Sequence, residues 1–155
     1  MFGTALTTMY AGWAAVQILA LNPLAAVPAH SLAQIHHDLR IAGESLGTLS
    51  VVAVLTIGVG LAAASLVFTL THRGMTVRAV AAIYLVLLSF GAIAYVTASF
   101  GAGVALADTY GISGRDAGLG AVPLYTTSGL ALLAVLTQAV TTVRSARPQL
   151  RLSPT

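Results

Sequence analysis

The side chains best able to do chemistry are concentrated in one segment of this chain, PAHSLAQIHHDLRIAGE at residues 28–44. The chain is 57% hydrophobic and 7% charged, yet this segment holds three of the four histidines and two of the four acidic residues. Histidine exchanges protons near neutral pH, carboxylates can serve as general acids or bases, and both can ligate zinc or copper. The candidate catalytic residues are therefore His36, His37, Asp38 and Glu44, together with the two acids of a later polar stretch, Asp108 and Asp116.

A metal site would draw on the same segment. Zinc or copper would use His30, His37 and Glu44 as ligands. The spacing argues against such a site, because His36 and His37 are adjacent and point about 100° apart on a helix. His36 also shares a helical face with Arg40, which places a cation where a second ligand should be. We therefore predict no resident cofactor and keep zinc or copper binding as the alternative.

Two other uses of these histidines are open. Val27-Pro28-Ala29 has the form of a signal-peptide cleavage site, and cleavage there would leave His30 as an N-terminal copper chelator. Against cleavage, residues 1–9 hold no basic residue and the apolar run is longer than a signal core. An exposed histidine could also sense pH near 6. The simplest interpretation is that these polar residues keep a connecting segment in water.

The elements that must position this segment are apolar. No Asp, Glu, Lys, Arg or His occurs in residues 1–29, 45–71, 79–107 or 117–143. Each run exceeds the roughly 20 residues that a helix needs to cross a hydrocarbon core. A helix is stable there because it satisfies its own backbone hydrogen bonds. We predict an all-α, integral membrane four-helix bundle.

The predicted bundle is a single transmembrane domain in the plasma membrane. Its spans cover about 3–23, 45–71, 79–106 and 119–143, and a polar tail follows at 144–155. The absence of cysteine excludes disulfides and thiolate-based metal sites. The net charge of +3 does not indicate nucleic-acid binding, since the basic residues lie next to the spans.

The arginines predict how the chain is oriented. Arg73 and Arg78 lie between spans two and three, and the tail holds Arg144, Arg147 and Arg151, whereas Arg40 and Arg115 lie in the other two connections. Short cytoplasmic loops collect basic residues. Five arginines on one side against two on the other place both termini in the cytoplasm, and all four acids then lie on the outer side.

The segment at 28–44 is itself expected to contain a short helix. Pro28 disrupts the end of the first span, and Ser31 followed by Gln34 forms a capping-box pattern. Leu32, Ile35 and Leu39 then repeat at helical spacing. These features predict an amphipathic outer helix at about 32–40 that lies on the membrane surface, with a continuation into the second span left open.

Small and polar residues repeat at helical spacing in every span, and such faces let membrane helices approach closely. The predicted interior faces are Thr7, Tyr10, Ala14 and Gln17; Ala53, Thr56, Gly60 and Ala63; Gly91, Ala94, Ala98, Gly101 and Ala105; and Ser128, Ala131, Ala134, Gln138 and Thr141. Gln17 and Gln138 are expected to bond across helices. Trp13 and Tyr95 fall near mid-span and either pack in the core or line a cleft for a lipid-like ligand.

Two functions from different classes follow. The first is a non-enzymatic subunit or binding module that uses its outer loops, with membrane lipid, a second copy of the chain or another membrane protein as partner. The second is a membrane-embedded enzyme that acts on a hydrophobic substrate with the outer His/Asp/Glu residues, with or without a metal. Convergence of the two outer loops beneath a lipid-accessible cleft would favour the enzyme.

Overall fold

The computed structural model describes residues 1–72 and 74–146, and every regular element within those two ranges is helical. Four helical stretches are long and apolar enough to cross a membrane: Phe2–Ala26, Thr48–Thr71, Val77–Tyr110 and Leu119–Ser145. The predicted all-α chain with four candidate spans is confirmed at this level. Arg73 and residues 147–155 of the predicted tail lie outside the described residues.

Nine helical elements follow one another within the described ranges. They are α1 (Phe2–Val16), a π-helical turn η1 (Gln17–Leu21), α2 (Asn22–Ala26), α3 (Leu32–Ile41), α4 (Thr48–Thr71), α5 (Val77–Ser89), α6 (Gly91–Tyr110), a 3₁₀ turn η2 (Leu119–Ala121) and α7 (Val122–Ala146).

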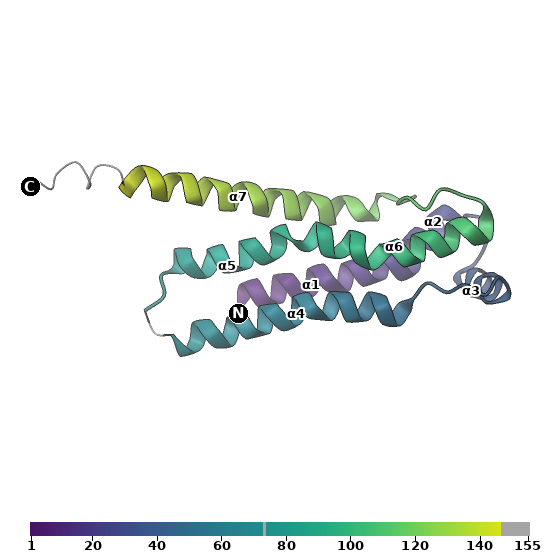
Figure 1. Ribbon diagram of the computed structural model, residues 1–155, viewed down its shortest axis with the longest axis horizontal. Coiled ribbons are helices and arrows are strands. Elements are labelled where there is room, and N and C mark those ends of the chain that lie inside the picture. The colour runs from purple at the N-terminus through teal and green to yellow at the C-terminus, as the bar shows by residue number, and fades with distance from the viewer. Residues whose placement is uncertain (73, 147–155) are drawn as a thin grey trace, which may run out of the picture.

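The long helices lie alongside one another and form an elongated bundle (Figure 1). Helix α1 packs against α4, α7 packs against α5, and α4 also packs against α6. The short helix α3 lies at one end of the bundle, which we call the α3 end. The start of α1 and the end of α7 lie at the opposite end, which we call the terminal end (Figure 1).

The first span buries the predicted face. Thr7, Ala14 and Gln17 are buried, and Tyr10 is half-buried. The span is not a uniform α-helix, because the backbone N–H of Asn22 donates to the carbonyl of Gln17, five residues earlier. This wider turn precedes Pro23, whose ring would clash with a carbonyl in a regular α-helix. Asn22 therefore lies on the same buried side as Gln17.

The third span, predicted as one segment, is two helices that meet at Phe90. A Cβ at the first residue of α6, Gly91, would come within 2.7 Å of the far end of the Tyr10 side chain, so glycine lets the Tyr10 ring pack on this junction. The predicted small-residue face of α6 is confirmed at Gly91, Ala98 and Ala105, which are buried.

The prediction for this face was wrong at Gly101, which is exposed. The close approach instead occurs at Gly103, where an added Cβ would lie 2.5 Å from the carbonyl oxygen of Gly114. The segment that follows α6 therefore lies back against α6, with backbone next to backbone.

The predicted interior face of the second span was wrong. Its four residues Ala53, Thr56, Gly60 and Ala63 are all exposed, and α4 instead buries Val51, Leu55 and Ala62. Larger aliphatic side chains fill the interior beside α1 and α6, which leaves the small residues on the outside. Exposure of the threonine hydroxyl is tolerated because Thr56 Oγ1 donates to the Val52 carbonyl of its own helix.

The fourth span follows its predicted face in part. Ser128 and Ala131 are buried and Gln138 is half-buried, whereas Thr141 is exposed. The expected bond between Gln17 and Gln138 is wrong, because the side chain of Gln17 has no partner among the described residues. The backbone carbonyl of Gln138 accepts a hydrogen bond from Arg78 instead (2.9 Å).

The short helix predicted at 32–40 is present as α3. Its capping box is complete: Ser31 Oγ accepts from the Gln34 backbone N–H (3.3 Å), and Gln34 Oε1 accepts from the Ser31 N–H (2.7 Å). Ile35 and Leu39 are buried, so its apolar side faces the bundle. The helix does not run on into α4, because Gly43 and Gly47 adopt positive φ angles of 77° and 61°.

Candidate functional site

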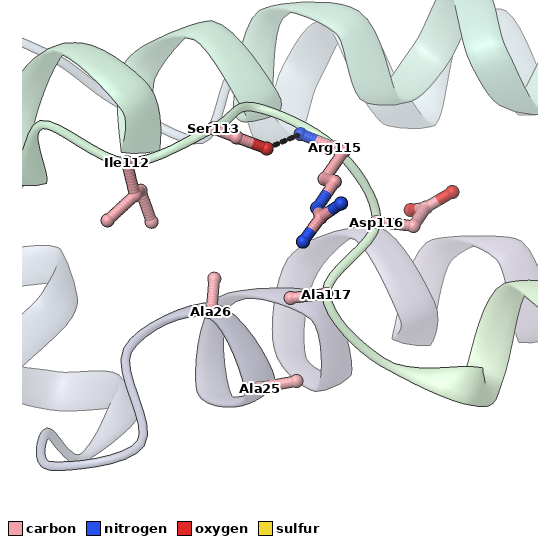
Figure 2. A pocket seen from close by; sticks show the side chains of 7 residues that line it. All are labelled: Ala25, Ala26, Ile112, Ser113, Arg115, Asp116 and Ala117. Atoms are coloured by element: carbon pink, nitrogen blue, oxygen red, sulfur yellow. Dashed lines mark hydrogen bonds between the residues drawn. The ribbon is translucent and has the colours of Figure 1, made fainter.

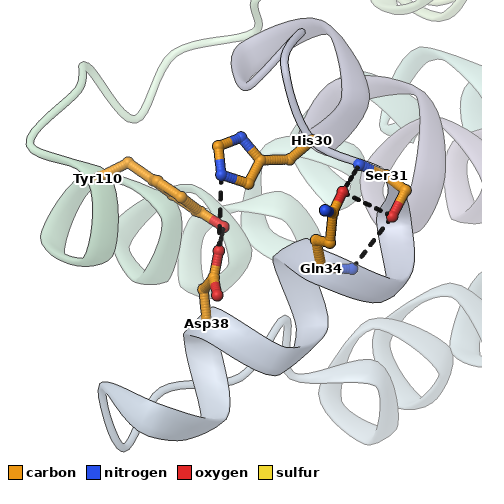
Figure 3. Close-up of polar contacts among 5 residues, drawn as sticks. All are labelled: His30, Ser31, Gln34, Asp38 and Tyr110. Carbon is orange, nitrogen blue, oxygen red and sulfur yellow. Dashed lines mark hydrogen bonds and ion pairs between the residues drawn. The ribbon is translucent and has the colours of Figure 1, made fainter.

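One polar cluster joins three elements at the α3 end. His30 lies in the turn before α3, and its Nε2 is 3.8 Å from Asp38 Oδ2. The hydroxyl of Tyr110, the last residue of α6, donates to the same carboxylate oxygen (2.9 Å). The rings of His30 and Tyr110 meet edge to face at 5.7 Å. Figure 3 shows that His30 and Tyr110 both approach Asp38, so this cluster fixes α3 against the end of α6.

A second cluster forms around Asp116, in the segment between α6 and η2. Gly111 turns the chain with a φ angle of 64°, and the backbone of Gly114 then packs on α6 at Gly103. This return brings Asp116 to two tyrosines. Tyr95 donates to Oδ1 (2.5 Å) and Tyr125 donates to Oδ2 (3.2 Å). Tyr95 is fully buried, so the carboxylate holds a hydroxyl that has no access to water.

The first span holds the same segment from the other side. Asn22 Oδ1 accepts from the Ala117 backbone N–H (2.8 Å), and Trp13 Nε1 donates to the Gly120 carbonyl (2.8 Å). The amide of Gln17 is fully buried, and neither of its polar atoms has a partner in the described part of the chain. That amide packs directly on Gly120, where a Cβ would overlap its oxygen. The segment after α6 and the η2 turn that follows it are therefore fixed by the first span, α6 and α7 together.

Two open cavities flank this segment. The first, of about 320 Å³, lies between the segment and α2 (Figure 2). The guanidinium of Arg115 points into this cavity, and the carboxylate of Asp116 points away from it. The second cavity, of about 500 Å³, lies along α6 and α7, and we call it the Asp116 groove. Its lining residues are Asn22, Val96, Ser99, Phe100, Val104, Ala107, Asp108, Gly114, Arg115, Asp116 and Tyr125.

The Asp116 groove has an apolar part and a charged part. Val96, Phe100 and Val104 line it at four-residue steps along α6, and they are 49%, 71% and 41% exposed. Asp108 is the next step of the same row and lies in the last turn of α6. Its carboxylate is exposed and makes no hydrogen bond or ion pair within residues 1–72 and 74–146. An apolar row on one helix thus ends in an unpaired carboxylate.

The predicted catalytic residues do not form one group. Asp108 and Asp116 line the same groove, and Asp38 lies next to His30. His36 and His37 are exposed on α3, and Glu44 is half-buried between α3 and α4. Neither of these histidines contacts Asp108 or Asp116 through a hydrogen bond or ion pair in the described part of the chain. The catalytic assignment stays a prediction.

The proposed metal ligands are also not gathered. Among the residues that the structure describes, no three His, Cys, Asp or Glu side chains come together to hold a metal ion. The assignment of zinc or copper to His30, His37 and Glu44 stays a prediction without geometric support.

Sequence reasoning missed the residues that hold Asp116. Tyr95, Tyr125 and Asn22 bond the segment that carries it, and Tyr110 bonds Asp38. One signal was available, because Tyr95 stands in the middle of an apolar run where interfacial tyrosines are not expected. A buried tyrosine hydroxyl needs a partner, and the nearest acid along the chain is Asp108, not the Asp116 that it finds.

No protein-family model, no curated protein and no solved structure matches this chain.

Proposed function

We propose that this chain is a small multi-pass protein of the plasma membrane that acts as a non-enzymatic binding module. Its ligand is an amphiphile that lies in the Asp116 groove. The observation that carries the proposal is the division of that groove into an apolar row on α6 and a charged part beside it. Ligand sites of this kind are concave and mostly apolar, with a few placed polar groups that fix orientation.

The groove is preformed, which supports a binding role. Asp116 is held through both carboxylate oxygens, and Asn22 holds the next residue of the same segment. A binding surface that is already ordered loses less conformational entropy when a ligand arrives. The polar residues of this segment therefore contribute to binding by keeping one wall of the groove in place.

The exposed apolar row suits a ligand that enters from lipid. Val96, Phe100 and Val104 belong to a candidate span, and their outer surfaces are not covered by other helices of the chain. A membrane-dissolved chain can lie on this row without crossing water, and its polar head can remain beside the charged part of the groove.

The enzyme alternative has less support. General acid–base catalysis needs a titratable group within hydrogen-bond reach of the reacting atom and a partner that orients it. Asp116 is engaged by Tyr95 and Tyr125, and the histidines His36 and His37 lie on α3 outside the groove. We therefore propose binding without chemistry.

The orientation of the chain is part of the proposal. If the arginine-rich terminal end is cytoplasmic, the groove lies toward the outer side. The chain has no cysteine, so single cysteines report sidedness directly. We expect Ser113→Cys to react with a membrane-impermeant maleimide on intact cells and Ser145→Cys to react only after permeabilisation. The reverse pattern would place the groove in the cytoplasm.

Native mass spectrometry in mild detergent tests the binding role. We expect the wild-type chain to retain an amphiphile and the Val104→Trp variant to lose it, because the indole would occupy the groove. Val140→Trp is the matched control, since Val140 has a similar exposure of 49% and does not line the groove. Equal retention by both variants, or none by the wild type, would overturn the proposal. The same spectra report whether the chain associates with a second copy, one of the two protein partners that the sequence leaves open.

A further inference from the structure

The charges along the Asp116 groove select the head group of its ligand. The groove is lined by two carboxylates, Asp108 and Asp116, and by Arg115. Figure 2 shows the Arg115 guanidinium pointing into the cavity beside α2, whereas the Asp116 carboxylate points away from that cavity. The groove is therefore lined by two negative charges against one positive charge, and the positive one is directed into the neighbouring cavity.

The two carboxylates differ in what they can still bind. Both oxygens of Asp116 already accept tyrosine hydroxyls, at 2.5 and 3.2 Å. Asp108 has no hydrogen-bond or ion-pair partner in the part of the chain that the structure describes. Asp108 is therefore the carboxylate that can accept hydrogen bonds from a ligand. Asp116 contributes its negative charge to the electrostatic potential in the groove.

The end of α6 adds a further preference for a cation. Asp108 lies in the last turn of this helix, which ends at Tyr110. The last carbonyls of a helix carry a partial negative charge, which favours a positive group near the C-terminus. The carboxylate of Asp108 and the C-terminal end of α6 therefore both favour a positively charged head group.

The length of the apolar row indicates the apolar part of the ligand. From Val96 to Asp108 the row spans twelve residues of helix, or about 18 Å at the usual rise per residue. A long alkyl chain can lie over Val96, Phe100 and Val104 with its head group at Asp108. A bulky, compact ligand would not use this length.

We infer that the ligand of the Asp116 groove is an amphiphile with a primary ammonium head and a long alkyl chain. This inference rests on the proposed binding function and names its ligand class. A primary ammonium has three N–H donors for the carboxylate of Asp108. A quaternary ammonium has no N–H to donate, and an anionic head would be repelled by both carboxylates.

The test uses three probes with the same chain and different heads: octadecylamine, octadecanol and stearate. Each is titrated against the purified full-length protein in neutral detergent, and bound adducts are counted by native mass spectrometry. We expect octadecylamine to bind up to about fivefold more tightly than octadecanol, which is the strength of an exposed ion pair. Stearate is expected to bind more weakly than octadecanol.

Two variants assign this preference to its residue. Asp108→Asn is expected to bring octadecylamine down to the affinity of octadecanol, and folding is not at risk because Asp108 is exposed and unpaired. Glu44→Gln removes an acid at the same end of the bundle that does not line the groove, and it should leave the preference unchanged. Equal loss in both variants would show a general charge effect and overturn the inference.

The remaining outcomes separate this inference from the proposed function. If Val104→Trp removes the binding of all three probes but the wild type does not prefer the amine, the binding function stands and the ammonium inference fails. If Val104→Trp changes nothing, the binding function fails and the inference fails with it. If the Asp108→Asn variant still preferred the amine, the ammonium head group would not bind at Asp108, and the inference would be wrong.

Discussion

Helices α6 and α4 are built from similar residues but use their glycines in opposite ways. In α6, Gly103 lies against the backbone of Gly114, and Gly91 lies against the ring of Tyr10. In α4, a Cβ added to Gly58 or Gly60 would meet nothing within 4 Å. A small residue in a membrane helix therefore permits a close approach, and the neighbouring segment decides whether that approach occurs.

The neighbouring segments differ in their polar groups. The segment after α6 carries Asp116, whose carboxylate accepts hydrogen bonds from the fully buried Tyr95 and from Tyr125. These bonds hold the segment against α6. Helix α4 is followed by a short connection to α5, and residues 74–76 of that connection make no hydrogen bond to α4 among the described residues.

The largest expected effect is at the backbone contact of α6. Gly103→Ala places a methyl group into the Gly114 carbonyl, and Gly114 lies two residues before Asp116, which is bonded to Tyr95 and Tyr125. Such overpacking costs about 2 kcal/mol. The free energy of unfolding in mixed micelles checks this value. Gly101→Ala, two residues away and with no neighbour within 4 Å, is the control and should be close to neutral. Equal stability of the two variants would contradict the described return of the segment.

The next largest loss of stability is expected when the carboxylate of Asp116 is removed. Asp116→Ala leaves the fully buried hydroxyl of Tyr95 without its acceptor. An unsatisfied buried polar group costs about 1–3 kcal/mol. Asp108→Ala removes an exposed and unpaired carboxylate from the same groove, and its effect should stay within about 0.5 kcal/mol. The same unfolding titration compares them, and a larger loss for Asp108→Ala would reverse the roles given to the two acids.

A smaller effect is expected at the other polar cluster. Asp38→Ala removes the acceptor of Tyr110 and the partner of His30. His30 and Asp38 are 37% and 34% exposed, so water screens the pair and the loss should be about 1 kcal/mol or less. Amide hydrogen exchange should therefore quicken in α3 and remain unchanged in α7. Faster exchange throughout the chain would mean that the cluster supports the whole bundle.

The smallest effect is expected on α4. Gly60→Ala adds a methyl group to an exposed position with no neighbour in the chain, so the free energy of unfolding should change by less than about 0.5 kcal/mol. Its mass distribution in native spectra should also match the wild type if this face meets only lipid. A shift in subunit number would show that the small residues of α4 contact a second copy, which is one of the partners proposed from the sequence.

Several parts of the fold were predictable from sequence because they depend on local physics. The four charge-free runs indicated the candidate spans, since helix length and hydrophobicity are read directly from residue type. The capping box at Ser31 and Gln34 indicated the start of α3, because both bonds join residues three apart. The faces of α1 and α6 were largely predictable, since small and polar residues are concentrated on them.

Other parts were not predictable because they depend on contacts distant in sequence. The face of α4 was predicted wrongly because its small residues lie on both sides, and hydrophobicity does not separate interior from lipid in a membrane helix. The inward turn of Asp116 depends on Tyr95, 21 residues earlier, and on Asn22, which bonds Ala117 across 95 residues. Spacing along the chain carries no information about such pairs.

The π-helical turn at Gln17–Leu21 has a consequence for how the length of the first span can vary. A backbone hydrogen bond there joins residues five apart instead of four, so the span contains one more residue than a regular helix would need. Deletion of Ala20 would leave Asn22 on the face of Gln17, now four positions apart, but the regular helix would then bring the Pro23 ring against a carbonyl. Deletion of Gly12 would instead rotate the preceding half of the span by about 100° relative to the rest. The extra residue of the first span therefore accommodates Pro23 while both halves of the span keep their buried side in phase.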